Sequence, residues 1–286
     1  AVNMPRQLPC PSVLFTHNVE AEIWRRHRER QPDPVRRFLF GQQWRRMQRF
    51  EGDTLSRFGL VLAVSDADRV TLQRLYASQL KAPVVTVATG VDTAFFAPRA
   101  GDISPRHLVF TGSMDWIPNE DAMKHFCLEI LPRIRAQQPE VSVSIVGRSP
   151  TPAVQRLAEI PGVEVTGAVD DVRDHIARAA VYIVPLRIGG GTRLKIFEAM
   201  GMGKAIVSTT VGAEGLPVTD GQDIVLADGP DRFAAAVVSL LQDPARRVQI
   251  EGGARRPVVE HNAWQALAGQ LAADLETAKI APVAAP

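Results

Sequence analysis

The chain has 286 residues, a formal net charge of +2, and 45% hydrophobic and 22% charged residues. This balance is typical of a globular protein of one large or two ordinary domains, and it excludes a disordered chain, a collagen-like fibre and the strong positive field of a nucleic-acid binder. No apolar run is long enough to span a membrane, and the two cysteines, Cys10 and Cys127, fit neither a disulfide framework nor a zinc site.

The first part of the chain alternates strands with helices. We expect strands at 11–16, 60–64 and 84–87 and helices at 19–29, 35–57 and 66–78. Ser65 is the expected N-cap of the helix that begins at Asp66. The turn-rich passage from Thr89 to Pro98 is typical of a linker, so we place the end of the first domain at residue 98.

Nine arginines fall between Arg25 and Arg49, opposed within that stretch only by Glu29 and Asp33. One interpretation is a solvated helical face. The other is a surface that docks on anionic lipid, where each basic side chain contributes about 1 kcal/mol. The start of the chain carries no export signal, so we expect a cytoplasmic protein, with the second interpretation placing it peripherally on the inner face of the plasma membrane.

The second part repeats the alternation more regularly. We expect strands at 107–111, 141–146, 163–166, 181–185, 205–208 and 224–226, and helices at 119–134, 153–159, 172–179, 192–202, 230–241, 244–251 and 261–278. A glycine follows each of the first four strands. Strand–glycine–helix units in succession are typical of a doubly wound parallel sheet, whose ligand binds at the carboxyl ends of the strands.

Three consecutive glycines, Gly189 to Gly191, precede an expected helix start with Arg193 and Lys195 in its first turn. Cations there oppose the helix dipole by about 0.3–1 kcal/mol each, and a bound anion would reverse the sign. The pattern predicts a phosphate site, with a solvated basic turn as the alternative. Glu198 lies about 9 Å further along the helix axis than Thr192, within reach of a ribose. Its alternative is a half-buried carboxylate paired with an arginine.

Several motifs in order then resemble one family. They are Leu62–Ser65, Gly90–Pro98, Phe110–Trp116, Ile145–Gly147, Val165–Val172, Val184–Leu186, Glu198–Val207 and Gly212–Leu216. Together they resemble the donor-binding core of GT-B glycosyltransferases of the large retaining GT4 group. The resemblance implies an α/β fold with a partial Rossmann-like acceptor-side domain and linker at 1–98, a complete donor-binding domain at 99–260, and a closing helix and tail at 261–286.

The resemblance also implies roles for individual residues. Glu198 would hold the ribose hydroxyls of a nucleotide sugar, the loop around Val169 would contact the base through its backbone, and His17 would face the acceptor and the leaving diphosphate. The other donor-binding positions are Gly112, Ser113, Gly147, Gly190, Gly191 and Thr192. The family implies no metal and no cofactor, because cationic side chains and amides stabilise the departing diphosphate.

The sequence departs from the family at two places. Gly190 stands where the first Glu of the family's E-x7-E motif is expected, which leaves the identity of the sugar open. The stretch from Gly112 to Asn119 lacks the usual Arg and Lys. We therefore hypothesise that Arg193 and Lys195 replace that pair on the diphosphate as catalytic residues.

The resulting functional prediction is transfer of a sugar, with retention, from a nucleotide-diphosphate sugar to a lipid-linked or saccharide acceptor. The Gly-Gly-Gly-Thr-Arg-Leu-Lys pattern resembles sugar transferases of exopolysaccharide or cell-envelope glycan synthesis. The alternative is a non-catalytic nucleotide-sugar-binding module or an inactive fragment, because the residues before Pro98 are few for a whole first domain and we expect a truncated N-terminus. An epimerase or phosphorylase is disfavoured, since neither an acidic epimerase site nor a lysine poised for pyridoxal phosphate is visible.

Overall fold

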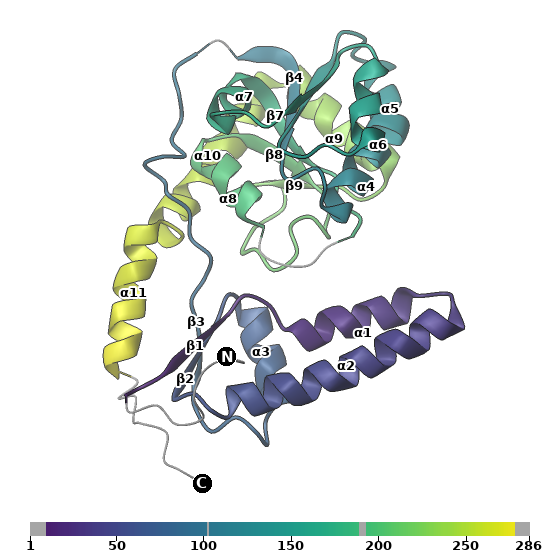
Figure 1. The fold of residues 1–286 in the computed structure, drawn as a ribbon. Helices are drawn as coiled ribbons and strands as arrows, with labels where there is room; N and C mark the ends of the chain where they lie inside the picture. Colours follow the sequence, from purple (N-terminus) through teal and green to yellow (C-terminus); the bar gives the residue numbers. More distant parts are fainter. Residues whose placement is uncertain (1–9, 102, 189–192, 278–286) are drawn as a thin grey trace. The chain divides into compact units, whose positions relative to one another are not determined.

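The computed structural model describes residues 10–101, 103–188 and 193–277. These residues form two compact units (Figure 1). Unit 1 takes residues 10–89 and 267–277, and unit 2 takes the described residues from 90 to 266. Within the described ranges, no helix is both long enough and apolar enough to cross a bilayer.

Unit 1 is built on a three-stranded parallel sheet. The strands are β1 (Val13–Thr16), β2 (Leu60–Ala63) and β3 (Val84–Thr86), in the order β1-β2-β3. Every residue of the central strand β2 is buried. Helix α3 (Asp66–Leu75) follows β2, and the Ser65 hydroxyl accepts a hydrogen bond of 3.1 Å from the Asp68 N–H, as the sequence predicted for this cap.

The remainder of unit 1 is dominated by a helical hairpin, α1 (Glu20–Arg30) and α2 (Pro34–Leu55), whose helices pack along one another. The Asp33 carboxylate caps α2 by accepting hydrogen bonds from the Val35 and Arg36 N–H groups. Pro34 occupies the first position of α2, where a missing N–H is harmless. The hairpin therefore has a well-defined loop end at residues 31–33.

A half-buried carboxylate anchors the other end of the hairpin. The Glu51 carboxylate of α2 accepts hydrogen bonds from the N–H groups of Glu20, at 2.6 Å, and Ala21, at 3.1 Å, in the first turn of α1. The Tyr76 hydroxyl, just after α3, donates to the same carboxylate at 2.5 Å. Burial raises the pKa of Glu51. One side chain thus ties together α1, α2 and the end of α3.

Unit 2 contains a six-stranded parallel sheet. Its strands are β4 (Ser104–Thr111), β5 (Ser142–Val146), β6 (Val163–Gly167), β7 (Ala179–Val184), β8 (Ala205–Ser208) and β9 (Val225–Leu226). Their order is β6-β5-β4-β7-β8-β9, and all neighbours are parallel. The order reverses between β4 and β7. In doubly wound sheets ligands bind at this switch point, outside the carboxyl ends of the strands.

Helices cover both faces of this sheet (Figure 1). Around β4, one face carries α4 (Ile117–His125), α5 (Leu131–Arg135), α6 (Pro152–Gln155) and α9 (Pro230–Gln242), and the other carries α7 (Val172–Arg178), α8 (Leu194–Gly201) and α10 (Pro244–His261). A π-helical turn, η1 (Phe126–Ile130), joins α4 to α5, and a short 3-10 turn, η2 (Arg156–Glu159), follows α6. The last described helix is α11 (Trp264–Thr277).

Helix α10 is longer than the sequence predicted. The expected end at residue 251 reflects Gly252, Gly253 and Pro257, which are poor helix formers, yet the helix continues to His261. The physical reason lies in packing. A Cβ at Gly253 would lie 2.1 Å from the Gln222 carbonyl oxygen, so only glycine lets the helix approach this backbone. The glycine marks a close contact and not a helix end.

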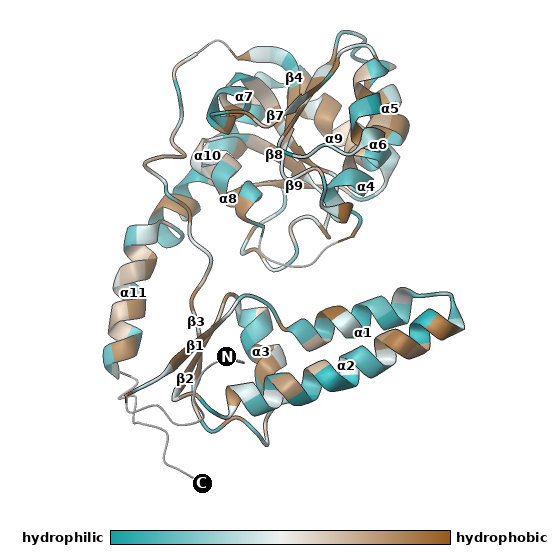
Figure 2. Ribbon diagram, in the orientation of Figure 1, coloured by the Kyte–Doolittle hydropathy of each residue, from teal (hydrophilic) through white to brown (hydrophobic). Residues whose placement is uncertain are grey.

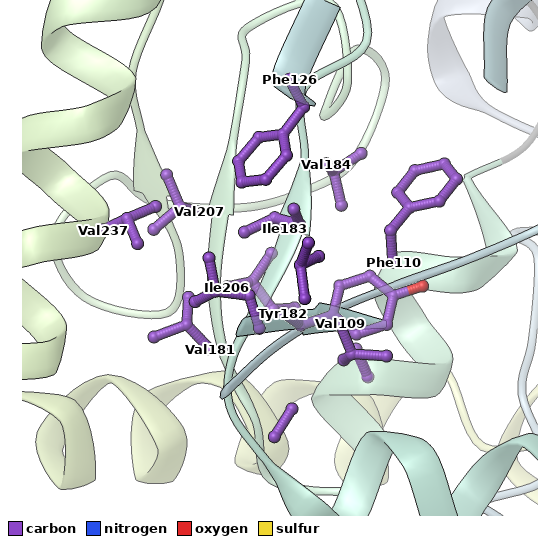
Figure 3. Packing of buried hydrophobic residues seen from close by; sticks show 14 of the residues in the cluster. Val109, Phe110, Phe126, Val181, Tyr182, Ile183, Val184, Ile206, Val207 and Val237 are labelled. Carbon is purple, nitrogen blue, oxygen red and sulfur yellow. The ribbon is translucent and has the colours of Figure 1, made fainter. Parts of the chain in front are cut away.

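The core of unit 2 follows from the hydrophobic strands (Figure 2). Phe110 on β4 and Tyr182 on β7 are fully buried at the centre of the sheet, and Phe126 packs edge-on against Phe233 of α9 at 6.3 Å between ring centroids. Figure 3 shows β4, β7 and β8 contributing side chains to one continuous cluster. Burial on both faces explains why these strands read as continuous apolar runs.

Candidate functional site

Two glycines end the neighbouring strands β4 and β5 at the carboxyl edge of the sheet. The Gly112 N–H donates to the Val146 carbonyl at 3.0 Å, and the Gly147 N–H donates to the Gly167 carbonyl at 3.1 Å. A Cβ at Gly147 would lie 1.7 Å from the Gly112 carbonyl oxygen, so glycine is required there by packing alone. These turns leave the space above Gly112 open to side chains from other elements.

Lys195 fills that space. A Cβ at Gly112 would lie 2.9 Å from the Lys195 Nζ atom and 2.6 Å from the Asn119 Nδ2 atom. Lys195 comes from the first turn of α8, which follows β7, whereas Gly112 follows β4. The amine therefore lies at the carboxyl end of β4, at the switch point, although it stands 83 positions further along the chain.

The Lys195 amine is held by two neighbours. It donates a hydrogen bond of 2.8 Å to the Asn119 Oδ1 atom and lies 4.0 Å from the centre of the Phe110 ring, within cation–π range. Burial and, to a smaller extent, the positive charge of Arg193 lower the pKa of Lys195 to about 7, and Glu198 opposes this shift. A bound anion would favour the charged amine and raise this pKa.

Asn119 is the site residue that the sequence analysis missed. Its side chain is buried at the start of α4, and its Nδ2 group donates to the Ser113 carbonyl at 2.8 Å while Oδ1 accepts from Lys195. Ser113 is held in turn: its hydroxyl donates to Asp115 at 2.6 Å and accepts from the Arg148 Nε group at 3.1 Å. The available signal was a polar residue in the first turn of the helix that follows the strand-ending Gly112 after a short turn.

Arg193 immediately precedes α8, at its N-cap position, and its side chain is buried. The Arg193 Nη2 group donates to the Val211 carbonyl at 2.9 Å and lies 4.0 Å from a Glu214 carboxylate oxygen. The guanidinium is thus fixed against the segment that follows β8. It adds a permanent positive charge at the start of α8, next to Lys195.

Glu198 lies three residues after Lys195, on the same face of α8. Burial raises the pKa of its carboxyl group, while the positive charge of Lys195 opposes the shift. Among the residues that the structure describes, none donates a hydrogen bond to this carboxylate or forms an ion pair with it. A partly buried carboxylate without donors has its acceptor capacity available for a ligand.

The other predicted site residues are placed as follows. Val169 lies in the loop after β6 and packs partly against the core of unit 2. His17 follows β1 in unit 1, with its ring edge-on to Phe15 at 4.9 Å between centroids. The predictions for Gly190, Gly191 and Thr192 fall outside the described residues. Unit 2 therefore brings together Gly112, Ser113, Gly147, Lys195 and Glu198, all at the carboxyl side of the sheet.

The match to a protein family covers this region. Residues 105–243 match the family described as glycosyl transferases group 1. The matched region extends from the second residue of β4 to the residue after α9, so it contains the switch point, Lys195 and Glu198.

The similarity to curated proteins extends beyond the residues that match the family. The chain is 30% identical over 230 residues to a phosphatidyl-myo-inositol mannosyltransferase of Mycolicibacterium smegmatis, which covers 76% of this chain and 56% of the relative. It is also 30% identical over 211 residues to an MMP alpha-(1->4)-mannosyltransferase of Mycolicibacterium hassiacum, covering 70% of this chain and 49% of that protein. The chain spans about half the length of these relatives.

Solved structures extend the likeness to nearly the whole chain. Anabaena Alr3699/HepE, crystallised with UDP and glucose, matches with a TM-score of 0.69 and 16% identity over 93% of this chain and 72% of its own. Sucrose-phosphate synthase of Thermosynechococcus elongatus also matches with a TM-score of 0.69, at 20% identity, over 93% of this chain and 68% of its own. The predicted α/β fold of the GT-B type is confirmed.

Proposed function

We propose that this chain binds a nucleotide-diphosphate sugar through the region that matches the family and transfers the sugar, with retention, to a lipid-linked or saccharide acceptor. The observation that carries the proposal is the pair on α8. The Lys195 amine at the carboxyl end of β4 and the Glu198 carboxylate, which accepts no hydrogen bond from a described residue, lie on one helix face, about 4.5 Å apart along its axis. Their order suits a diphosphate followed by a ribose.

The amine suits the diphosphate because of where it lies. Lys195 extends over Gly112, where the absence of a side chain leaves room for the amine beside the backbone at the carboxyl end of β4. The start of α8 adds the positive end of a helix dipole, and the fixed Arg193 guanidinium adds a further positive charge. We infer that Lys195 takes the place of the basic residues that the family usually carries after its first donor-domain strand, with Arg193 as its electrostatic support.

The carboxylate suits the ribose for the complementary reason. Sugar hydroxyls are donors, and Glu198 accepts from no described residue. Hydrogen bonds from two ribose hydroxyls to this partly buried carboxylate would offset the free-energy cost of its desolvation. The base would then extend toward the loop that contains Val169. This assignment follows the resemblance, in which the second Glu of the family motif binds the ribose.

The reaction follows from the same arrangement. The bond between the anomeric carbon and the diphosphate oxygen breaks, and the acceptor hydroxyl oxygen forms a new bond to that carbon on the same face. The hydroxyl proton passes to the leaving diphosphate. Negative charge grows on the diphosphate as it departs, so a preorganised cation at Lys195 stabilises the transition state more than the bound donor. His17 of unit 1 is proposed for the acceptor side.

The biological role is proposed on narrower grounds. The pattern from Gly189 to Lys195 resembles that of sugar transferases that build exopolysaccharides or cell-envelope glycans. The curated relatives are named as mannosyltransferases, and one structural neighbour was solved with UDP and glucose. These names favour a hexose donor.

Calorimetric titration tests the assignment of the two residues. We expect Lys195→Ala to weaken binding of UDP, GDP or ADP, whichever binds, by tenfold or more, and to leave binding of the matching nucleoside unchanged because a nucleoside has no phosphate. Glu198→Gln should weaken both. Matched controls are Lys124→Ala and Glu129→Gln, which alter exposed groups on α4 and η1. Equal affinities of wild type and K195A for the diphosphate would contradict the proposal.

Turnover separates an enzyme from a binding module. We expect the chain to release the diphosphate from a donor that it binds, and the anomeric proton of the product, followed by NMR, to keep the configuration of the donor. K195A should lower kcat more than it raises KM. Nucleotide binding without turnover, across the three classes of donor and with saccharide and lipid-linked acceptors, would favour the binding module instead.

A further inference from the structure

An exposed apolar stripe occupies the loop end of the α1–α2 hairpin. Val35, Phe38 and Leu39 are 66%, 65% and 54% exposed. Their spacing of three and four residues places them on one face in the first turns of α2. Figure 2 shows this hydrophobic segment near the loop end of a helix that is otherwise largely hydrophilic. We call these three residues the tip stripe.

The tip stripe is not needed to hold the hairpin together. The two helices contact one another through the rings of Trp24, His27 and Phe40, whose centroids lie about 6 Å apart, and through Arg28 over the Trp44 ring. The buried residues of α2 are Gly52, Thr54 and Leu55, at its far end. A face with no structural role that exposes Phe, Leu and Val together indicates a surface that another body covers.

The charges around the tip stripe decide what covers it. Arg36 and Arg37 lie between its members, and no described residue forms a hydrogen bond or an ion pair with their side chains. Asp33 is the only acidic residue between Gln31 and Arg49, and its carboxylate is engaged in capping α2. Further along α2, Arg45, Arg46 and Arg49 extend the positive charge. This end of the hairpin is thus apolar and cationic, and its two acidic residues are already engaged, Asp33 in capping α2 and Glu29 in an ion pair with Arg25.

We propose that the loop end of the hairpin binds an anionic lipid surface. Val35, Phe38 and Leu39 enter the boundary between headgroups and acyl chains, and Arg36 and Arg37 bind lipid phosphates. This combination of apolar side chains beside arginines is the pattern by which amphipathic helices lie on membranes. The inference goes beyond the proposed sugar transfer and is independent of it, because binding to lipid requires no donor.

Co-sedimentation with vesicles tests the proposal on the whole chain. We expect binding to vesicles of phosphatidylcholine with 30% phosphatidylglycerol, at least tenfold weaker binding to pure phosphatidylcholine, and a loss of affinity as salt screens the charges. Phe38→Ser with Leu39→Ser should weaken binding to the anionic vesicles by at least tenfold. Arg36→Gln with Arg37→Gln should weaken it several-fold and reduce its dependence on salt.

Matched controls separate the tip stripe from general surface effects. Val70→Ser removes an apolar side chain of α3 that is 54% exposed, and Arg232→Gln with Arg256→Gln removes two charges from the surface of unit 2. Neither should change vesicle binding, and circular dichroism melts should match wild type for every variant. Wild-type binding by F38S/L39S would overturn the proposal. A dimer in sedimentation velocity that F38S/L39S abolishes, with no vesicle binding, would assign the tip stripe to a second copy of the chain.

Discussion

The two units of this protein bury apolar surface in different ways. Unit 2 surrounds six parallel strands with helices on both faces and buries one large continuous cluster. Among the described residues, the buried cluster of unit 1 is smaller and consists of Val19, Leu55, Val61, Ala63, Leu72, Tyr76 and Val84. Unit 1 adds the hydrogen bonds of the half-buried Glu51 carboxylate, and it leaves the apolar tip stripe exposed. Unit 1 therefore depends more on a polar anchor, and unit 2 more on apolar packing.

The largest loss of stability is expected from a substitution in the core of unit 2. Phe126→Ala removes a fully buried ring that packs against Phe233, and it should lower the stability of unit 2 by about 3–5 kcal/mol. Hydrogen exchange read by mass spectrometry should show faster exchange in β4 and β7 with little change in β2. Equal acceleration in β2 would mean that the two units share one unfolding equilibrium. Leu72→Ala, in the core of unit 1, is the reciprocal control.

A smaller loss of stability is expected when the hydrogen bonds of Glu51 in unit 1 are removed. Glu51→Ala removes the acceptor of two backbone N–H groups and of the Tyr76 hydroxyl, and it should destabilise unit 1 by about 2 kcal/mol. Hydrogen exchange in α1 and β2 is the measurement. Tyr76→Phe removes only one of these hydrogen bonds and should cost about 1 kcal/mol. Glu29→Ala breaks an exposed pair with Arg25 and should cost less than about 0.5 kcal/mol, so an equal loss in E29A would refute the anchor.

The fold was predictable from the sequence because its signals are local. The alternation of strands and helices, the strand-ending glycines and the Ser65 cap all lie within a few residues of the structure they specify. The continuation of α10 was not predictable, since Gly253 serves a contact with Gln222, which is distant in sequence. A glycine has the same local preference whether it ends a helix or permits a close approach.

In the candidate site, too, the features with a local sequence signal were predictable and the contacts between distant residues were not. The choice of α8 as the ligand-facing helix followed from its glycines and misplaced cations, and the strand order explains why a helix after β7 meets the end of β4. The bond between Lys195 and Asn119 joins residues 76 positions apart, so no local pattern contains it. Base contacts made through backbone in the Val169 loop have no side-chain signature at all, and this assignment remains a prediction.

Burial in unit 2 is expected to make the affinity of the candidate site for a diphosphate depend on pH. Because the pKa of Lys195 is held near 7, the amine is largely neutral in the free protein above that pH and must take up a proton when a diphosphate binds. Between about pH 7.5 and 8.5 the terminal phosphate of UDP is already largely ionised and uracil still carries its N3 proton, so the ligand contributes little opposing change. Affinity for the diphosphate should therefore fall by up to tenfold per pH unit, which is about 1.4 kcal/mol, until the pKa of the bound state is reached.

Lys195→Arg isolates this cause. A guanidinium stays charged throughout the range, so the affinity of K195R should be nearly independent of pH, even if its value at pH 7.5 is lower because arginine fits the Asn119 contact less well. Calorimetry in buffers of different ionisation enthalpy should show proton uptake near pH 8 for wild type and none for K195R. A pH dependence that survives in K195R would belong to another group. Its disappearance would show that desolvation beside Phe110, supplied by the large core, sets the charge of the residue that binds the ligand.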